Sequence, residues 1–272
     1  MSDTNIKLSI AIASYNEAEN IQPCLESVKD LADEIVVVDG TSTDKTAELA
    51  REMGAAVIVV PNQKNFHINK TLAIDNCHGE WILQLDADER VSTALAQEIK
   101  TIISSPNSVS YAAFYLKRRN YFLGRWMNKG GMYPDPVIRL FQKGRAHLPE
   151  KTVHELMVVD GETSWLDNDL LHIADPTFSR YLKRSNRYTT LQAEEWLKDG
   201  KIGLGWPTII LYCFGKPIYR FFEIYLRHKG LLDGFPGFVF ALYSGLHITS
   251  SYVKYYEKRK SGKGITLSTD WE

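Results

Sequence analysis

The amino-acid sequence predicts an α/β fold, in which a Rossmann-like, mostly parallel sheet is flanked by helices and followed by a helical C-terminal region. Two observations predict this architecture. Short apolar strands alternate with helical segments through the first 90 residues, the spacing of right-handed βαβ crossovers. After residue 175 the strand signals stop, and long segments with helical spacing follow. We therefore expect two domains, residues 1–175 and residues 176–272.

The first 90 residues contain the signals of four strands separated by three helices. Each strand is an apolar run of the length expected for a buried strand of a parallel sheet. The expected strands are residues 8–13, 34–39, 56–60 and 81–85. The expected helices are residues 20–31 with Pro23 in the first turn, residues 42–54 from the capping cluster Ser42-Thr43-Asp44 to Gly54, and residues 69–77.

From about residue 110 the strand and helix signals become less regular. Apolar runs predict strands at residues 111–116, 137–141 and 165–173. A long helix is expected from the capping residue Thr177 to Asp199, with Gly200 as its stop signal. Two further helical segments, residues 207–228 and 236–260, are aromatic and edged with Lys or Arg.

Residues 234–253 form a stretch of 20 residues without a formal charge, which is close to the length of a membrane span. The stretch also contains Pro236, His247 and several Gly and Ser residues, and basic residues flank both ends. Three alternatives stay open: an interior helix of a soluble domain, an amphipathic helix in the plane of a membrane surface, and a true span.

The composition excludes several classes of protein. Of 272 residues, 44% are hydrophobic and 24% are charged, which allows a packed core and excludes wholesale disorder. Cys24, Cys77 and Cys213 are far apart and form neither a disulfide framework nor a CxxC metal knuckle, so we expect a reducing compartment. The N-terminus is polar and acidic, and nothing in it predicts secretion.

The net charge of −1 conceals an asymmetry along the chain. Residues 1–175 carry 17 Lys and Arg against 25 Asp and Glu, a net of −8. Residues 176–263 carry 15 Lys and Arg against 6 Asp and Glu, a net of +9. A basic region rich in aromatic residues favours contact with phosphates, either of a nucleic acid or of an anionic membrane surface.

Three strand ends carry the residues best placed to bind a ligand. In open α/β sheets, ligands bind beyond the carboxyl ends of the strands. The residues expected there are Ser14-Tyr15-Asn16-Glu17, Asp39-Gly40 and Asp86-Ala87-Asp88. This edge is acidic, which is the wrong sign for a bare phosphate. Either a cation sits there, or the acids accept hydrogen bonds from hydroxyl and imide donors.

Asp86 and Asp88 can share one divalent cation, because carboxylates at i and i+2 of an extended segment reach the same ion or its water shell. Hard oxygen ligands suit Mg²⁺ or Mn²⁺, and such an ion would neutralise a diphosphate as it leaves. The alternative is a solvated acidic turn before the helix cap at Ser92.

Three more side chains are candidates for ligand contacts at this edge. Asp39 is placed to accept the imide N–H of a nucleobase, or else to continue into the Ser42 capping cluster. Glu17 is placed to hold a ribose or base, or else to complement the dipole of its helix. Lys70 is placed to reach a phosphate, although a lone Lys is usually solvated.

Four motifs, in this order, resemble glycosyltransferase family 2 over about the first 120 residues. They are Ser14-Tyr15-Asn16-Glu17, Val36-Val37-Val38-Asp39-Gly40 with Ser42-Thr43-Asp44, Asn69-Lys70-Thr71-Leu72-Ala73, and Gly79-Glu80-Trp81 leading to Leu85-Asp86-Ala87-Asp88-Glu89-Arg90. Later motifs are similar to bacterial branches that build lipopolysaccharide core and related surface glycans. These are residues 119–124, 130–135, 139–141, 153–155 and 171–172.

The resemblance implies a GT-A fold for residues 1–175, a nucleotide-diphosphate sugar donor, with a UDP-sugar as first choice, a divalent metal and inversion at the anomeric carbon. It assigns Asp39 to the nucleobase, Asp86 to the ribose and metal shell, and Asp88 to the metal. The remaining residues expected at the donor site are Ser14, Tyr15, Glu17, Lys70 and Ala87.

Inverting enzymes of this type need a carboxylate base to deprotonate the acceptor hydroxyl. In many relatives this acid lies in a Glu-Asp pair on a later helix, whereas this chain has His154-Glu155. We expect Glu155 to be the base, with Asp135 as the second choice. His154 is an expected metal ligand, and His172 is an alternative contact for the metal or a phosphate, although a lone His is more often structural.

The expected function is an inverting, metal-dependent glycosyltransferase that is peripheral on the cytoplasmic face of a bacterial plasma membrane. Its acceptor is expected to be a lipid-linked saccharide, because the basic, aromatic C-terminal region favours an anionic membrane surface. Nucleic acid is not an expected partner, because it would meet an acidic crevice. Transfer to polyprenyl phosphate and a non-catalytic sugar-nucleotide-binding subunit stay open as alternatives. A dinucleotide oxidoreductase fits worse, because the first strand–helix turn lacks GxGxxG.

Overall fold

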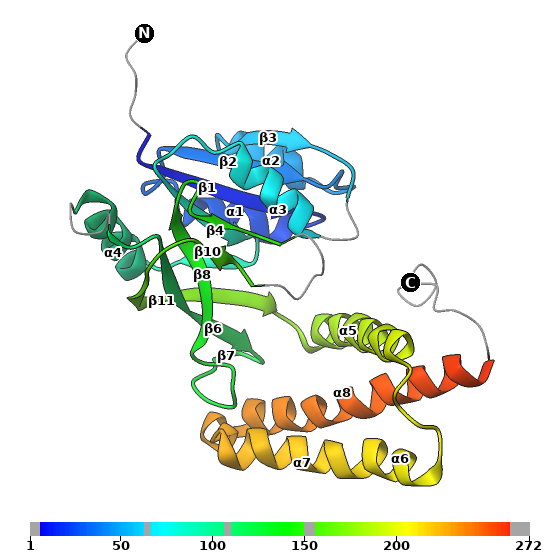
Figure 1. Ribbon diagram of the computed structural model, residues 1–272. Coiled ribbons are helices and arrows are strands. Elements are labelled where there is room, and N and C mark those ends of the chain that lie inside the picture. The colour runs from blue at the N-terminus through cyan, green and yellow to red at the C-terminus, as the bar shows by residue number, and fades with distance from the viewer. Residues whose placement is uncertain (1–5, 63–65, 106–109, 150–155, 262–272) are drawn as a thin grey trace. The chain divides into compact units, whose positions relative to one another are not determined.

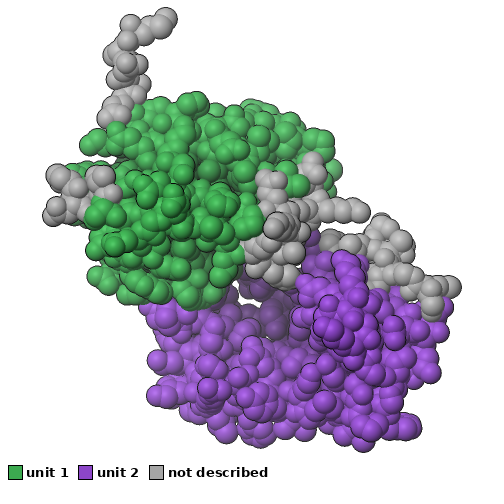
Figure 2. All heavy atoms as spheres, in the orientation of Figure 1, with its two compact units in different colours: residues 1–119, 135–172 green, residues 120–134, 173–272 purple. Residues whose placement is uncertain are grey.

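The computed structural model describes residues 6–62, 66–105, 110–149 and 156–261. The chain divides into two compact units (Figure 2). The first consists of Met1–Arg119 and Asp135–His172, and the second of Asn120–Pro134 and Ile173–Glu272. The two domains expected from the sequence stay a prediction, because compactness does not show that either part folds independently.

Four parallel strands in the first unit form one half of a sheet, in the order β3-β2-β1-β4 (Figure 1). A helix lies between each strand and the next along the chain, as the βαβ pattern predicts. The elements are β1 (Leu8–Ser14), α1 (Ala18–Glu26), β2 (Glu34–Asp39), α2 (Thr46–Glu52), β3 (Ala56–Val59), α3 (Phe66–Asp75) and β4 (Trp81–Asp86).

Beyond β4 the sheet continues with antiparallel pairs. Strand β8 pairs with β4, β6 pairs with β8, and the order then runs to β11 and β5. The elements are β5 (Glu89–Val91), α4 (Thr93–Ser104), β6 (Ala113–Phe122), β7 (Arg125–Trp126), β8 (Asp135–Gln142) and β11 (Thr163–Asp175). Strands β9 (Ala146–His147) and β10 (Val158–Val159) form a separate ladder. This mixed sheet confirms the predicted α/β class.

The hydrophobic core of the first unit lies on both faces of the parallel strands. Successive strand residues point to opposite faces. In β1, Ile10 and Ile12 therefore join a buried cluster with Leu25 of α1, while Ala11 joins a second cluster with Ala73 of α3. Both faces are covered, which is why these strands read as continuous apolar runs.

Every strand and helix expected in the first 175 residues is present, with ends displaced by a few residues. The helix expected from Ser42 begins only at Thr46, because the Ser42 hydroxyl bonds to strand-end residues instead. Gly54, the expected stop signal, follows α2 with φ +82°, a left-handed conformation that glycine adopts without a Cβ penalty.

The second unit is mainly helical, as expected. The long helix α5 (Phe178–Asp199) begins and ends at the predicted caps: the Thr177 hydroxyl accepts the Arg180 N–H at 3.2 Å, and Gly200 is left-handed at φ +64°. The remaining elements are α6 (Trp206–Ile210), η2 (Leu211–Gly215), α7 (Lys216–Phe222), η3 (Glu223–Arg227), η4 (Gly230–Asp233) and α8 (Gly234–Ser261). Here η2 and η3 are π-helical turns and η4 is a 3₁₀ turn.

Helix α8 is the central element of the second unit and packs against both α5 and α7. Its side chains Tyr252 and Tyr255 are fully buried beside Ala193 of α5. In the part of the chain that the structure describes, one helical segment, Gly230–Ser261, is long and apolar enough to cross a membrane by length and composition. Only 28% of its most apolar window is buried within the protein, which is low for a core helix of a soluble domain.

Candidate functional site

The candidate site lies at the carboxyl ends of the central parallel strands. Ser14, the last residue of β1, is in register with Asp39, the last residue of β2. On the other side of β1, Ala13 is in register with Asp86, the last residue of β4. The ladder registers therefore hold the two predicted acids on either side of the end of β1, at the edge where open α/β sheets bind ligands.

Hydrogen bonds join the loops that follow β1 and β2. Asn16 adopts a left-handed backbone (φ +54°), its N–H donates to the Ser42 hydroxyl at 2.9 Å, and its side-chain oxygen accepts the Thr43 N–H at 2.8 Å. Asn is among the residues that tolerate this conformation best. The Glu17 N–H donates to the Thr46 hydroxyl at 2.8 Å. The two loops therefore form one cross-linked rim.

Asp39 is buried at the base of this rim. Its two carboxylate oxygens accept the Ser42 N–H at 2.8 Å and the Ser42 O–H at 2.5 Å. Asp39 therefore does contact the Ser42 capping cluster, which is the alternative role that the sequence allows for it. Each carboxylate oxygen has further acceptor capacity, so these bonds also orient Asp39 for a donor from a ligand.

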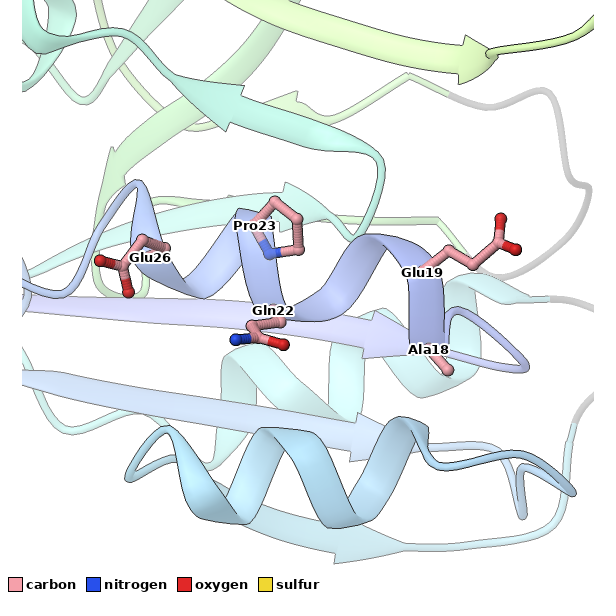
Figure 3. Close-up of a pocket in the computed structure, with 5 residues that line it drawn as sticks. All are labelled: Ala18, Glu19, Gln22, Pro23 and Glu26. Carbon is pink, nitrogen blue, oxygen red and sulfur yellow. The ribbon is translucent and has the colours of Figure 1, made fainter.

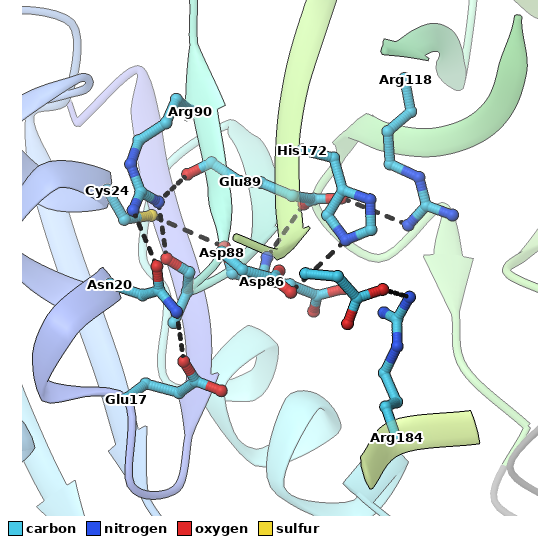
Figure 4. Close-up of polar contacts among 12 residues, drawn as sticks. Glu17, Asn20, Cys24, Asp86, Asp88, Glu89, Arg90, Arg118, His172 and Arg184 are labelled. Atoms are coloured by element: carbon cyan, nitrogen blue, oxygen red, sulfur yellow. Dashed lines mark hydrogen bonds and ion pairs between the residues drawn. The ribbon is translucent and has the colours of Figure 1, made fainter. Parts of the chain in front are cut away.

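The other β1-end residues differ in their environment. Ser14 is buried, and its hydroxyl has no hydrogen-bond partner among the residues that the structure describes. Tyr15 is exposed, and Glu17 accepts a hydrogen bond from Asn20 at 2.7 Å (Figure 4). A buried hydroxyl without a partner costs free energy, so the Ser14 hydroxyl is available for a polar ligand group.

Asp86 is surrounded by cations. Its carboxylate forms ion pairs with Lys70 and with Arg139, the latter at 2.6 Å between Oδ2 and Nη2, and Gln84 donates to it at 3.2 Å. Burial alone would raise the pKa of Asp86, but the positive charges of Arg139 and Lys70 outweigh burial and hold that pKa well below its usual value. Asp86 is therefore ionised at neutral pH.

Glu89, at the start of β5, links Asp86 to Arg139. It is fully buried, and its Oε2 accepts the Asp86 N–H at 3.0 Å (Figure 4). Its Oε1 accepts a hydrogen bond from Arg139 Nη2 at 2.8 Å. Burial lowers the pKa of Arg139, but the carboxylates of Asp86 and Glu89 raise that pKa by a larger amount. The net pKa lies above its usual value, so the guanidinium stays charged.

Arg118 links this cluster to Asp135, the second-choice base. Its Nε and Nη2 both donate to Asp135 Oδ2, at 2.9 and 2.6 Å, and its Nη1 lies 3.5 Å from Glu89. Burial lowers the pKa of Arg118, and the charges of Glu89 and Asp135 raise it above its usual value. Asp135 thus lies at the start of β8 with one carboxylate oxygen engaged by a guanidinium.

Asp88 lies between β4 and β5 and faces His172 of β11. The distance from Asp88 Oδ2 to His172 Nε2 is 3.4 Å, and His172 pairs in register with Glu89 on β5 (Figure 4). Ala87 is buried between the two acids of the motif, and its carbonyl accepts Arg90 Nη1 at 2.7 Å. The side chains of Asp88 and His172 are 20% and 12% exposed, so both are partly accessible to a ligand.

Two of the predicted residues, His154 and Glu155, lie outside the described residues, and the predictions made for them are untested. Within the described ranges, no group of three or more His, Cys, Asp and Glu side chains is arranged to hold a metal ion. Asp88 and His172 offer two potential donor atoms, which are fewer than a divalent cation needs to fill its coordination shell.

Four further residues of this site are not predicted from the sequence: Gln84, Glu89, Arg118 and Arg139. Arg139 and Arg118 come from strands that pair antiparallel beyond β4, and no spacing in the sequence indicates that pairing. A usable signal was present for Glu89 and Arg139, because each is a charged residue within or beside an apolar strand.

A separate hollow of about 350 Å³ lies along the outer face of α1 (Figure 3). All of its lining residues come from that helix, and the strand-end acids do not contribute. We therefore do not assign it to the site. Its lining residues are Ala18, Glu19, Gln22, Pro23 and Glu26.

Comparison with known proteins agrees with the motifs. The sequence profile described as Glycosyl transferase family 2 matches residues 9–158, more than half of the chain. An uncharacterized glycosyltransferase of Rickettsia bellii is 30% identical over 244 residues, covering 86% of this chain and 80% of the relative. The lipopolysaccharide core biosynthesis glycosyltransferase LpsC of Rhizobium meliloti is 28% identical over 260 residues, covering 93% of each chain.

Among solved structures, the mannosyltransferase PcManGT of Pyrobaculum calidifontis, in complex with GDP-Man and Mn²⁺, is similar to this chain with a TM-score of 0.51. It is 15% identical, and the match covers 93% of this chain and 88% of that chain. This likeness concerns the fold, which is the GT-A fold that the motifs imply. The family profile and the 30% identical relative show that the chain is a glycosyltransferase and belongs to glycosyltransferase family 2.

Proposed function

We propose that this enzyme is an inverting, metal-dependent glycosyltransferase that moves a sugar from a nucleotide-diphosphate donor to a lipid-linked saccharide in cell-envelope glycan synthesis. The observation that carries the proposal is the convergence of Asp39, Asp86 and the Asp88–His172 pair at one edge of the sheet. The relative named for lipopolysaccharide core biosynthesis, aligned over 93% of each chain, supports the choice of acceptor class.

The donor site is proposed to follow the strand ends. Asp39 accepts the imide N–H of the nucleobase, and the buried Ser14 hydroxyl supplies a further contact on the same rim. Asp86, ionised and held by two cations, accepts the ribose hydroxyls, while Lys70 provides positive charge for the diphosphate. Tyr15 and Glu17 border the base and ribose, and a UDP-sugar is the first donor to test.

The residues present fit a divalent cation. Asp88 supplies an anionic oxygen, which suits Mn²⁺ or Mg²⁺, and diphosphate oxygens would complete the shell. His172 supplies a ring nitrogen, a donor that Mn²⁺ accepts more readily than the harder Mg²⁺. Asp86 is already engaged by Lys70 and Arg139, so it is assigned to the outer shell of the ion. When bound, the cation would offset the negative charge that develops on the leaving diphosphate. His154 stays a second candidate ligand.

The transfer itself needs one base from the protein. A carboxylate, Glu155 or else Asp135, takes the proton of the acceptor hydroxyl. The hydroxyl oxygen forms a bond to the anomeric carbon as the bond from that carbon to the diphosphate oxygen breaks, and the nucleoside diphosphate leaves with the electron pair. Attack on the face opposite the leaving group inverts the anomeric configuration.

The enzyme is proposed to act peripherally on the cytoplasmic face of a bacterial plasma membrane, where nucleotide sugars and lipid-linked acceptors meet. The exposed apolar and basic side chains of the second unit support this location. No nucleic-acid partner is proposed.

A donor screen tests the catalytic proposal. UDP-, GDP- and nucleoside-diphosphate-heptose sugars are compared for thermal stabilisation of the full chain, with and without Mn²⁺. A donor present at about 100 times its Kd should stabilise the folded protein by roughly 2.7 kcal/mol, and omission of Mn²⁺ should remove most of that gain. If no sugar nucleotide stabilises the chain with either Mn²⁺ or Mg²⁺, the proposal is wrong.

A further inference from the structure

The segment from Trp206 to Arg227 presents a regular apolar stripe to solvent. Every fourth residue along it is a large apolar residue whose surface is more than half exposed, a repeat maintained over 21 residues. The stripe residues are Trp206, Ile210, Phe214, Ile218, Phe222 and Leu226. Contiguous exposed apolar surface of this kind marks a site of interaction.

The two π-helical turns keep these side chains on one face. In an ideal α-helix, a repeat of four residues drifts by about 40° at each step, or roughly 200° over the whole stripe. A π turn takes up about one extra residue without advancing the helix. With η2 and η3 in place, the 20 residue-to-residue steps from Trp206 to Leu226 make about five whole turns. The local irregularity therefore builds a straight stripe.

Helix α8 carries a second stripe of exposed apolar residues, of which Phe238 also contacts the rings of Phe221 and Tyr225. Residues at intervals of three, four, four and seven positions are exposed, which fits one side of an α-helix. The other side is buried, and at Gly245 an added Cβ would lie 2.7 Å from the Pro217 carbonyl oxygen, so α7 and α8 meet there backbone to backbone. The exposed residues of this second stripe are Phe235, Phe238, Leu242, Leu246 and Val253.

The segment that carries the first stripe is also basic. The segment from Trp206 to Lys229 carries Lys216, Arg220, Arg227 and Lys229 against one acid, Glu223, which pairs with Arg220 at 2.6 Å and Arg227 at 3.7 Å. Two copies of this surface would bring these like charges together, whereas an anionic lipid surface complements both the charge and the apolar side chains.

The packing of α8 favours an orientation in the membrane plane over a span. Helix α5 packs along α8, and Lys254 of α8 donates to Asn186, Thr189 and Thr190 of α5. If α8 crossed the bilayer in this arrangement, the charged side chains of α5 would have to enter the hydrocarbon with it, at high cost. A helical layer lying in the interface avoids that cost.

We propose that the stripe formed by Trp206, Ile210, Phe214, Ile218, Phe222 and Leu226 docks in the plane of an anionic lipid bilayer, with its apolar side chains in the acyl boundary and its basic side chains among the headgroups. The proposal rests on the membrane-associated function proposed above and names the surface that performs it. The bilayer then holds the enzyme at the surface that carries a lipid-linked acceptor.

The full chain is tested against vesicles of equal parts phosphatidylglycerol and phosphatidylcholine by co-sedimentation at low salt. Replacing Phe214→Ser together with Ile218→Ser should weaken partitioning at least about tenfold, because two large apolar side chains no longer enter the boundary. The matched control, Leu182→Ser with Tyr188→Ser, removes two exposed apolar side chains of α5 in the same unit and should retain binding within about twofold. Circular dichroism checks that both variants fold.

Three outcomes would overturn this docking surface. In the first, both variants bind vesicles as well as the wild type does. In the second, both variants lose the same amount of binding. Either result would show that the stripe is not the surface that binds the bilayer. Alternatively, the wild type could ignore vesicles and form a concentration-dependent dimer that Phe214→Ser with Ile218→Ser disperses, so that a second copy covers the stripe. Donor stabilisation with Mn²⁺ is measured in parallel, because its loss alone contradicts the catalytic proposal and leaves vesicle binding untouched.

Discussion

At the scale of single residues, the candidate site is less acidic than its motifs suggest. Asp86, Glu89 and Asp135 are matched by Lys70, Arg118 and Arg139, so these three acids are balanced by three cations. Asp88 lies 3.4 Å from the imidazole of His172. In the proposed site, Asp88 and His172 bind the metal, and Asp86 is held in place beside them by Lys70 and Arg139.

The first prediction concerns the metal. Asp88→Asn should lower transfer by at least about 100-fold, because a metal-bound leaving group contributes several kcal/mol and each 1.36 kcal/mol is a factor of ten. Mn²⁺ binding followed by electron paramagnetic resonance should weaken in parallel. Asp30→Asn, which removes one exposed acid of the same unit, should change neither. Full turnover by Asp88→Asn, or by the wild type in EDTA, would contradict the metal role.

The second prediction concerns the base. Glu155→Gln should lower kcat by about 10²-fold or more, because general base catalysis typically contributes 10² to 10⁴. Donor affinity should stay within about twofold, since the base contacts the acceptor. Asp135→Asn is the parallel variant; if it alone loses turnover, the assignment reverses to the second choice.

The third prediction follows from the depressed pKa of Asp86. Asp86→Asn removes the carboxylate that pairs with Lys70 and leaves Arg139 paired with Glu89, and it should destabilise the protein by about 3 kcal/mol at pH 7. Because the folded-state pKa lies below the unfolded value of about 3.9, the unfolded chain takes up the proton first as the pH falls. The stabilisation is therefore full above about pH 5 and is lost as the pH falls below 4 through the folded pKa.

Urea unfolding at a series of pH values measures this difference. The gap between wild type and Asp86→Asn should narrow steadily below about pH 4. Glu162→Gln, which changes an exposed acid, should show a gap near zero at every pH. A gap that stays constant from pH 7 to pH 3 would show that the Asp86 charge does not contribute to stability.

Some residues of the site can be predicted from the sequence, and there is a physical reason why the others cannot. Asp39 and Asp86 end parallel strands, and the βαβ rule places such ends together without any knowledge of the structure. Arg118 and Arg139 arrive through antiparallel pairing between distant segments. Local pattern does not encode that partner choice, so the sequence does not predict which acids Arg118 and Arg139 contact.

At the scale of elements, some strands and helices are determined by their own sequence, whereas others depend on a partner that is distant in the chain. Strands β1, β2 and β4 are long apolar runs and were predicted within one residue at each end. Strands β7, β9 and β10 have two residues each and exist only because a partner pairs with them. The π turns η2 and η3 interrupt a segment predicted as one helix, because a helical periodicity does not reveal an inserted residue.

The fourth prediction tests the clearest local signal, the cap of α5. Thr177→Ala removes the hydroxyl that accepts the Arg180 N–H and should lower the free energy of unfolding by about 1 kcal/mol. Thr101→Ala, on the exposed surface of α4, should change it by less than about 0.5 kcal/mol. Chemical denaturation measures both values. Equal effects of the two substitutions would show that the cap does not stabilise the helix.

At the scale of the whole molecule, charge separates along the chain while the total stays near zero. Residues 1–175 carry a net charge of −8 and residues 176–263 a net charge of +9. The net charge of the whole chain therefore does not predict whether the protein binds a charged surface. The negative part belongs to the strand-end chemistry and the positive part to the helical region. A protein of net charge −1 is therefore expected to bind an anionic membrane through one part of its surface.

The last prediction separates the electrostatic and apolar contributions to that binding. Each basic residue near an anionic surface contributes about 1 kcal/mol, and the contribution is screened as the Debye length falls from about 30 Å at 0.01 M salt to about 3 Å at 1 M. Burial of apolar side chains is not screened. Wild-type binding to phosphatidylglycerol vesicles should therefore fall with salt to a finite remainder.

Replacing Lys216, Arg220, Arg227 and Lys229 by Gln should bring low-salt binding down to that remainder and abolish most of the salt dependence. The control replaces the same number of exposed basic residues of the same unit, Lys183, Arg187, Lys198 and Lys201, so the net charge of the two variants is equal. If the control loses as much binding, the attraction belongs to the total charge of the helical region and not to the stripe. Resistance of the wild type to both high salt and carbonate, with release only in detergent, would instead indicate that α8 spans the bilayer.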